Sequence, residues 1–415
     1  MGQGRLTTTN HESVWPDSLR RAAKRTRLDS DGWRPIVIEM KHAKAAAQLD
    51  TLINDHPIHK IVDNYDEQYA ELIVSRHPQL YQATLAVKQE SLKPYLHKHY
   101  DGKEPWQLGS WAYFPWSGTL VHLLEKELFL ESRTIRNKDL ITVAEQQKYA
   151  DFTVGCAGMS VGSNVALSLA ISGGSQKIKL ADGAVISASN LNRIMAGVQE
   201  VGNSKSAVIA RKLYEMNPYM EVECNLDNIT EKTIDSFFEQ PWSLRVVVDE
   251  IDDLKTKILL RIEARKRGIP VVMATDLGDD VMLDIERFDL NKKLPLFHGL
   301  VPNVEELLTK EVSKREWLKY ATAIIGPHNT PLRMQQSLLK IGTKLVTQPQ
   351  LGPTAAMSGV AVAYAVRQLA TGEKLRSGRT LISLDKHLRS DLVTLRYRRS
   401  HKKHTRQLKR ALDAM

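Results

Sequence analysis

The pattern of apolar and polar positions divides the middle of the chain into short apolar runs separated by segments with helical periodicity. The apolar runs lie at residues 152–157, 177–181, 220–225, 244–249 and 271–274, and the helical segments between them at residues 163–171, 202–216, 231–238 and 255–267. Buried runs that alternate with helices are typical of parallel strands joined by crossover helices. We therefore expect an α/β fold with a doubly wound, mostly parallel Rossmann-like sheet.

Helical patterning dominates the region that precedes this sheet. Residues 41–98 are helical in pattern, after a possible strand at 36–40, a short basic helix at 18–27 and a disordered segment at 1–14. The expected order is a mainly helical N-terminal domain, a nucleotide-binding domain and a basic C-terminal tail, at residues 1–132, 133–385 and 386–415. Within the second domain, residues 291–350 predict a crossover segment that lies over the nucleotide crevice. A strand at 281–288 is expected to be antiparallel.

Composition narrows the cellular setting and the classes of partner. The two cysteines, Cys156 and Cys224, lie far apart and form neither a disulfide framework nor a zinc motif, which indicates a reducing, cytoplasmic compartment. No apolar run is long enough for a membrane span. The formal net charge is +10, and residues 386–410 hold ten Lys or Arg against the single acidic Asp391. Such a tail either binds a nucleic acid or another acidic partner, or is simply solvated.

A glycine turn follows the first apolar run of the sheet. Gly158 and Gly162 flank Ser160 in the sequence GMSVG, directly before a helical segment. Backbone N–H groups in such a turn favour a phosphate group. Asp182 ends the second apolar run, 24 residues after Gly158, which is a suitable spacing for a ribose contact. These features predict a nucleotide site.

Further charged residues lie at or after later strand ends. In open α/β sheets the carboxyl ends of the strands share one crevice, so Asp249 and Asp252 are expected near the glycine turn. Either carboxylate suits Mg²⁺ held together with substrate phosphates. Arg193 and Lys205 add positive charge after the second strand. This combination favours a nucleoside triphosphate, whose phosphate charge must be neutralised during displacement.

Taken together, these motifs resemble the ubiquitin-activating enzyme/ThiF/MoeB superfamily of ATP-dependent adenylating enzymes. The motifs that carry the resemblance are Arg133-x-x-Arg136-Asn137, the glycine turn, Asp182, Ser189-Asn190-Leu191-Asn192-Arg193, Gly202-x-x-Lys205, Asn217-Pro218, Val248-Asp249-x-x-Asp252-Asp253 and Leu351-Gly352-Pro353. The resemblance covers residues 133–290 and 345–385 and makes 133–385 an adenylation domain. It implies that a substrate carboxylate attacks the α-phosphate of MgATP, giving an acyl-adenylate and pyrophosphate.

The resemblance also implies roles for individual residues. Asp182 holds the ribose, with Gly158, Ser160, Gly162 and Asn192 around the nucleotide. Phosphate contacts come from Asn190, Arg193 and Lys205, and Asp252 holds Mg²⁺. Arg136 reaches the phosphates of a neighbouring subunit, which implies a homodimer.

Three departures from the family pattern modify this expectation. The family turn is usually G-x-G-G-x-G, whereas this chain has GMSVG, and Ile194 stands where a Gln usually follows the arginine. No cysteine occurs between residues 277 and 350, where thioester-forming members carry theirs. We therefore expect direct transfer of the acyl group to a nucleophile, without an enzyme thioester. The carboxylate belongs to a peptide, a protein C-terminus or a small acid.

Three alternatives remain open from the sequence alone. GMSVG also fits the G-x-S-x-G elbow of α/β-hydrolases, with Ser160 as the nucleophile. Its partners would be Asp249 or Asp276 and His298 or His328. The altered turn also allows a nucleotide-binding scaffold without catalysis, and the βαβ pattern allows an NAD(P) oxidoreductase. In the adenylation interpretation, Asp276 and His298 are candidates for contact with the carboxylate or the nucleophile.

Overall fold

The computed structural model describes residues 32–311 and 313–414, so the disorder and the short helix expected before residue 28 lie outside the described part. The described residues form two compact units. The larger unit comprises residues 147–209 and 221–414, and the smaller unit comprises residues 32–146 and 210–220. This division leaves residues 133–146 and the Asn217-Pro218 motif with the smaller unit, whereas the glycine turn, Asp182, Arg193, Lys205 and Asp252 belong to the larger one.

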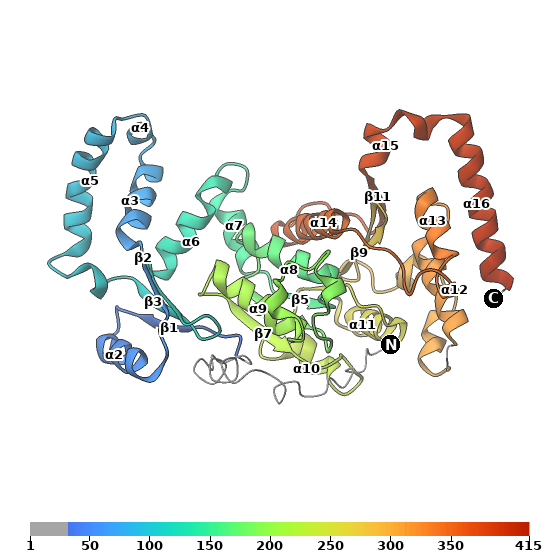
Figure 1. Cartoon of the computed structure of the whole chain (residues 1–415), viewed down its shortest axis with the longest axis horizontal. Coiled ribbons are helices and arrows are strands. Elements are labelled where there is room, and N and C mark those ends of the chain that lie inside the picture. The colour runs from blue at the N-terminus through green and yellow to red at the C-terminus, as the bar shows by residue number, and fades with distance from the viewer. Residues whose placement is uncertain (1–31, 312, 415) are drawn as a thin grey trace, which may run out of the picture. The chain divides into compact units, whose positions relative to one another are not determined.

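The larger unit is organised around a seven-stranded sheet (Figure 1). Its strand order is β11-β10-β9-β8-β5-β6-β7, in which β5 to β9 run parallel and β10 and β11 are antiparallel additions at one edge. The bounds are β5 (Val154–Ala157), β6 (Lys177–Ala181), β7 (Glu221–Asn225), β8 (Val246–Asp249), β9 (Val271–Leu277), β10 (Asp280–Glu286) and β11 (Gly378–Ser383). The predicted doubly wound, mostly parallel fold is confirmed. The order in which strands are added reverses at β5, because β6 and β7 lie on one side of it and β8 and β9 on the other. In such folds, ligands bind at this point of reversal, between β5 and β8.

Helices cover both faces of this sheet. On one face α8 (Val161–Ile171) packs against α14 (Gly352–Thr371) (Figure 1). The two backbones approach closely at Gly359, where a Cβ would lie 2.6 Å from a backbone atom of Asn164. On the other face, α10 (Ile234–Glu239) and α11 (Leu254–Arg267) supply side chains to the main apolar core. The helix α9 (Lys205–Met216) joins β6 to β7. Because the sheet is covered twice, its central strands are almost wholly apolar.

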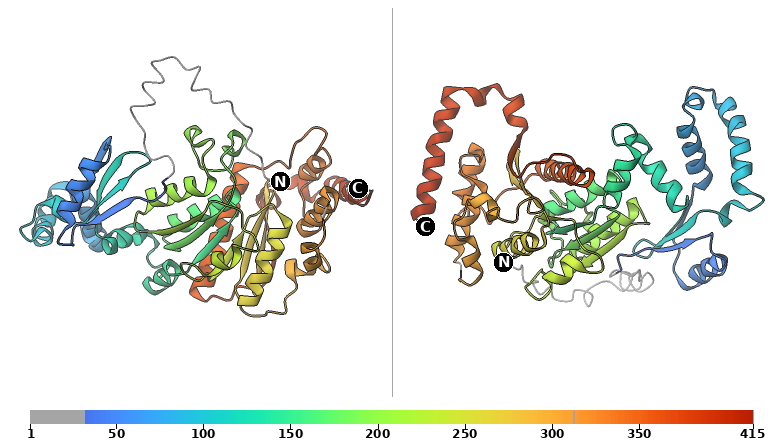
Figure 2. Two further views of the ribbon diagram at one scale, coloured as in Figure 1. Left: turned by 90° about the horizontal axis from the view of Figure 1, so that it is seen from below. Right: turned by 180° about the vertical axis from the view of Figure 1, so that it is seen from behind.

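The crossover segment and the C-terminal tail pack together at the antiparallel edge. The segment contains the 3-10 helices η6 (Leu296–Gly299) and η7 (Val304–Leu308), which pack on α11, followed by α12 (Lys314–Ile325) and α13 (Leu332–Leu338). The tail contains α15 (Leu384–Leu388), η8 (Ser390–Val393) and α16 (Leu395–Ala414). Figure 2 shows α16 alongside α12 and α13. The tail is therefore a docked helix, which the sequence analysis did not foresee.

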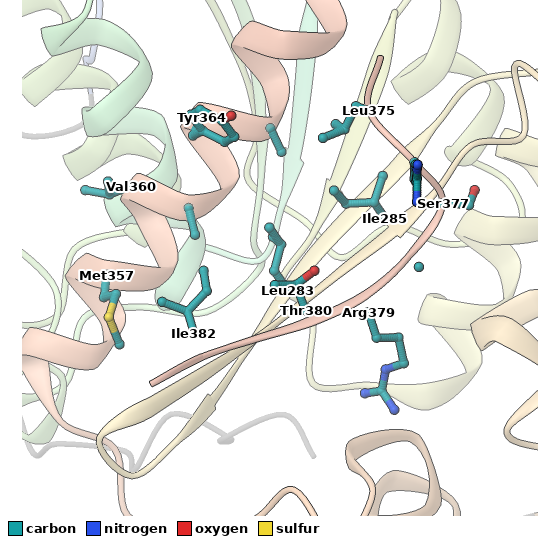
Figure 3. Close-up of a pocket in the computed structure, with 14 residues that line it drawn as sticks. Leu283, Ile285, Met357, Val360, Tyr364, Leu375, Ser377, Arg379, Thr380 and Ile382 are labelled. Carbon is teal, nitrogen blue, oxygen red and sulfur yellow. The ribbon is translucent and has the colours of Figure 1, made fainter. Parts of the chain in front are cut away.

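An apolar groove lies between α14 and the strands β10 and β11 (Figure 3). Val360 and Tyr364 of α14 and Leu283 and Ile285 of β10 are among the residues that line it, and its volume is about 670 Å³. None of the residues predicted to bind the nucleotide lines this groove. The groove is therefore separate from the predicted nucleotide site.

The smaller unit combines helices with a four-stranded sheet in the order β1-β3-β4-β2. The strands are β1 (Ile36–Glu39), β2 (Lys60–Asp63), β3 (Ser110–Phe114) and β4 (Thr119–Leu123), and the helices of the unit include α2 (Ala45–Asp55), α3 (Tyr65–Arg76), α4 (Pro78–Tyr81), α5 (Leu85–Tyr100) and α6 (Lys126–Thr134). Helices supply most of its regular structure, as expected. Only β1 was expected from the sequence, because β2 lies within the helically patterned residues 41–98 and β3 and β4 are short runs with weak periodicity. In the described part of the chain, no helix has the length and apolar character to cross a membrane.

Candidate nucleotide-binding site

The turn between β5 and α8 requires glycine at its first position. Gly158 has φ = 90°, and a Cβ there would lie 2.3 Å from the carbonyl oxygen of Glu250. Its N–H donates to the carbonyl oxygen of Ala181 at 2.8 Å, which ties the turn to the end of β6. Gly162 is less constrained, because a Cβ there would meet Met159 and Glu250 at 3.4 Å or more. The turn therefore places the amino end of α8 at the carboxyl edge of the sheet.

Asp182, directly after β6, is fixed against this turn. Its Oδ2 accepts a hydrogen bond from the Met159 N–H at 2.7 Å, and its Oδ1 accepts from the Ala184 N–H at 2.8 Å. Lys205 Nζ, at the start of α9, lies 3.7 Å from Asp182 Oδ2. The predicted ribose and phosphate residues are thus brought to the same side of the glycine turn.

Arg193 lies over the amino end of α8. Its Nε donates to Ser160 Oγ at 2.9 Å, and Nη1 donates to Asn192 Oδ1 at 2.9 Å. Asn164 Nδ2 donates to the Arg193 carbonyl oxygen at 2.9 Å and so anchors the backbone of the loop. Burial lowers the pKa of the Arg193 guanidinium, and the neighbouring carboxylates Asp252 and Asp276 oppose this change. A partly desolvated guanidinium beside a helix amino end is a strong site for an anion.

The two asparagines of the same loop already have structural partners. Asn190 Oδ1 accepts from the Ser187 N–H at 3.1 Å and closes a capping box on η4 (Ala188–Asn190). Asn192 Nδ2 donates to the Gln350 carbonyl oxygen at 2.9 Å. The last residue of the predicted crossover segment therefore does reach the nucleotide loop.

The acidic residues after β8 have different surroundings. Asp249 is fully buried and pairs with Arg261, and its Oδ2 lies 3.2 Å from Lys257 Nζ. Burial alone would raise its pKa, but the two cations outweigh burial and lower the pKa of Asp249. Asp253 caps α11 by accepting from the Thr256 N–H at 2.8 Å. Asp252 is exposed at the same strand end, so it is the carboxylate left for a cation.

A magnesium site built from protein ligands alone does not occur in the described residues, since no group of three or more His, Cys, Asp or Glu side chains is placed to hold a metal. Mg²⁺ usually binds nucleotides through one or two carboxylates together with phosphate oxygens. The exposed Asp252 fits that arrangement.

Two further carboxyl groups lie at this edge, and Glu250 was missed by the sequence analysis. Glu250 Oε1 accepts from the Ala274 N–H at 2.8 Å, and loss of solvent raises the pKa of Glu250 well above its ordinary value. Asp276 is 5% exposed, and its Oδ1 accepts from Ser358 Oγ at 2.6 Å. Its Oδ2 has no hydrogen-bond partner among the described residues, and burial raises the pKa of Asp276. Glu250 gave no separate signal, because it lies within a run of acidic residues.

His298, a candidate for contact with the carboxylate or the nucleophile, lies beside Asp284 of β10. His298 Nε2 is 3.3 Å from Asp284 Oδ1, and Asp284 also pairs with Arg379. Asp284 lies opposite Met273, three residues before Asp276 on β9, which corresponds to about 10 Å along the strand. The sequence could not reveal this, because it depends on the β9–β10 register and on the path of η6.

The hydrolase alternative and the cysteines can be judged from their contacts. Ser160 Oγ accepts from Arg193, and no histidine partner of Ser160 occurs among the described residues. The serine therefore lacks the base that a nucleophile elbow needs.

Cys156 is buried in β5, and burial raises the pKa of its thiol. Cys224 Sγ donates to the Ser206 carbonyl oxygen.

The sequence profile of the ThiF family matches residues 132–408, about two thirds of the chain. The chain belongs to the ThiF family. The superfamily predicted from the sequence motifs is thereby confirmed, and membership supports the prediction of an adenylyltransferase. The match also includes the crossover segment and most of the C-terminal tail.

Two curated relatives are each 33% identical to this chain. The uncharacterized protein MT1398 of Mycobacterium tuberculosis matches over 274 residues, which cover 66% of this chain and 38% of that protein. The chain thus spans well under half of this relative's length. The tRNA threonylcarbamoyladenosine dehydratase of Bacillus subtilis matches over 193 residues, 45% of this chain and 71% of that protein.

Solved structures with detectable likeness include two Escherichia coli proteins. MccB with ATP has a TM-score of 0.41 at 19% identity, covering 59% of this chain and 64% of that chain. The tRNA N6-threonylcarbamoyladenosine dehydratase has a TM-score of 0.41 at 21% identity, covering 58% and 95%.

Proposed function

We propose that the protein catalyses ATP-dependent adenylation of a substrate carboxylate. The observation that carries this proposal is the placement of Arg193 on Ser160 at the amino end of α8, with Asp182 and Lys205 beside the same turn. A carboxylate oxygen of the substrate forms a bond to the α-phosphorus of ATP. The bond between that phosphorus and the oxygen bridging to the β-phosphate breaks, and pyrophosphate leaves with the electron pair.

The proposed roles follow from the charge and position of each group. Asp182 has lone pairs left after its two backbone contacts and accepts from the ribose hydroxyls. Arg193 and Lys205 neutralise the phosphates, where negative charge develops on the leaving group. Asp252 is the residue that would hold Mg²⁺, which would neutralise phosphate charge when bound.

Two classes of molecule are candidates to carry the carboxylate. A peptide, a protein C-terminus or a small acid fits the general reaction. A modified tRNA nucleoside is the second candidate, because the Bacillus subtilis relative is named for tRNA threonylcarbamoyladenosine.

We further propose that the acyl group passes directly to the acceptor nucleophile. Both cysteines lie outside residues 277–350, so no thioester cysteine is expected there. The free Oδ2 of Asp276 is the group proposed to receive the proton of the nucleophile or to orient it. We also propose a homodimer in which the partner's Arg136 contributes to the phosphate site, in keeping with the exposure of Arg136 in η3 (Ile135–Asn137).

Exchange of labelled pyrophosphate into ATP tests the proposal. The assay uses a panel of small acids, peptides and total tRNA as carboxylate donors. Arg193→Ala and Asp252→Ala should each reduce exchange at least 100-fold, as loss of a phosphate-stabilising group does in other enzymes. Asp50→Ala, which removes an exposed acid on α2 of the smaller unit, serves as the matched control and should retain full exchange.

Nucleotide titration separates the remaining alternatives. Binding of ATP without exchange for any member of the panel would favour the non-catalytic scaffold. Tighter binding of NAD(P) than of ATP would favour the oxidoreductase. Full exchange by the Asp252→Ala variant would contradict the proposed site.

A further inference from the structure

The C-terminal helix α16 is held in a fixed rotation by its inner face. Leu408 is 2% exposed and packs with Met334 and Leu338 of α13. One helical turn earlier, Thr405 Oγ1 accepts from Gln335 Nε2 at 2.9 Å. His401, one turn earlier again, donates from Nε2 to the Thr330 carbonyl oxygen at 3.0 Å. Spacings of three and four residues place these contacts on one side of the helix, so the rest of its surface faces outward.

The outward surface of α16 carries positive charge along its whole length. Eight basic residues are exposed on it: Arg396, Arg398, Arg399, Lys402, Lys403, Arg406, Lys409 and Arg410. We call this set the basic face. The sequence of α16 contains a single acidic residue, Asp413, at its far end.

No ion pair within the described residues neutralises the basic face. The contrast with nearby arginines is direct, since Arg389 pairs with Asp385 and Asp391. Arg265 and Arg267 on α11 likewise pair with surface carboxylates. The basic face thus repels itself, because like charges at spacings of three and four residues are unfavourable on a helix. A helix with this charge pattern gains stability from an anionic partner.

We propose that the basic face of α16 binds the phosphodiester backbone of a nucleic acid. From Arg396 to Arg410 the helix rises about 21 Å, at 1.5 Å per residue. A strand of B-form duplex presents a phosphate about every 3.4 Å along its axis, so this length spans about six phosphates. The eight cations of the basic face are distributed along this whole length, so several phosphates can be contacted at once. The recognition is electrostatic and independent of base sequence.

A membrane surface is a poorer fit to this helix. An interfacial helix buries an apolar side in the lipid. The apolar side of α16 is already used, because Leu408 is packed against α13. The one large apolar residue of α16 that stands exposed in the described residues is Leu395, at the helix start.

A folded acidic protein is also a poorer fit. Specific protein interfaces centre on buried aromatic or aliphatic anchors. Tyr397 is the one aromatic residue of α16, and it is only partly exposed. The face therefore offers charge without anchors, which suits a uniform polyanion.

Fluorescence anisotropy of the full-length protein tests this proposal. The probes are a labelled 30-nucleotide single-stranded RNA, its duplex and the matching DNA duplex, each measured from 50 to 300 mM salt. A phosphate contact contributes about 0.7 to the logarithmic salt slope on a single strand and about 0.9 on B-form DNA. The quadruple variant R396Q/R399Q/K403Q/R406Q should reduce the slope by about three and the affinity at 100 mM salt by about 100- to 1000-fold. The arms of the experiment show which nucleic acid is preferred.

A matched control keeps the charge change constant. The variant K44Q/K60Q/K98Q/K103Q removes four exposed lysines from the smaller unit and should bind like the wild type. Equal loss in both variants, or binding that does not depend on salt, would overturn the proposal. Tighter binding to vesicles containing anionic lipid than to any of the nucleic acids would also overturn it. Because the measurement needs neither ATP nor a carboxylate, it can fail or succeed independently of the proposed adenylation.

Discussion

The buried ion-pair group beneath the nucleotide site gives the strongest prediction about stability. Arg261 of α11 lies between Asp249, at the end of β8, and Glu286 of β10, with Nε donating to Glu286 Oε2 at 2.6 Å. All three side chains are essentially inaccessible to solvent. Replacing Arg261 with Met keeps the apolar volume but leaves two buried carboxylates without this partner. Breaking a buried pair in this way costs about 3–5 kcal/mol, because the remaining charge is uncompensated.

The matched control is Arg267→Met on the same helix. Arg267 pairs with Asp235, Glu239 and Glu263, but these contacts lie near the surface. Exposed pairs contribute about 0–1 kcal/mol. The free energy of unfolding, measured by urea titration, should therefore fall much further in Arg261→Met than in Arg267→Met. Equal losses would refute the account of the buried group.

The pH dependence adds a second test of the same group. In the wild type the pKa of Asp249 is lowered, so its stabilising contribution is present above its unfolded pKa of about 3.9. That contribution is lost as the pH falls through the lower folded value. In Arg261→Met, Asp249 keeps Lys257 but loses its second cation, so its pKa should be higher than in the wild type. The deficit of the variant should then be largest near pH 7 and shrink as the pH falls towards 4.

Three further predictions concern single positions. Gly158→Ala should lower the free energy of unfolding by at least about 1–3 kcal/mol and abolish ATP binding measured by calorimetry, because the new Cβ would meet Glu250 and the positive φ is strained. Unchanged ATP binding would contradict the role of this turn in the nucleotide site. Asp276→Asn should raise the thermal midpoint at pH 7, because a carboxyl group whose folded pKa is raised destabilises the fold above that pKa. The same variant should lose transfer of the acyl group to the nucleophile but keep pyrophosphate exchange. Unchanged transfer would contradict a role for Asp276 in the site. Leu408→Ala should release α16 from α13, which should speed amide hydrogen exchange along α16. If the tail and α13 unfold together with the rest of the protein, the free energy of unfolding should fall by about 2–5 kcal/mol. Hydrogen exchange as slow as in the wild type would contradict the docking of α16.

The parallel core of the fold could be predicted because its strands are strongly apolar. Val246, Val247 and Val248 form such a strand, and Asp182 and Arg193 were correctly brought to one edge by the rule that parallel strands end together. The short strands β2, β3 and β4 of the smaller unit gave too little periodicity to be recognised. The docking of α16 was hidden, because a single buried leucine stands among charged residues.

The different roles of the acidic residues after β8 could also not be predicted from the sequence. Asp249 and Asp252 look equivalent along the chain, but only the structure shows that Asp249 is buried on Arg261 whereas Asp252 is exposed. The surroundings of His298 were hidden for a related reason. Its position depends on a register between β9 and β10 that no local pattern encodes.

The fate of the carboxylate oxygen tests the central claim most directly. The acid that supports pyrophosphate exchange is prepared with ¹⁸O in its carboxylate and incubated with ATP and the acceptor nucleophile. If the carboxylate attacks the α-phosphorus, mass spectrometry should find one ¹⁸O in AMP and none in pyrophosphate. Formation of ADP and phosphate, or of AMP without the label, would contradict adenylation by this protein.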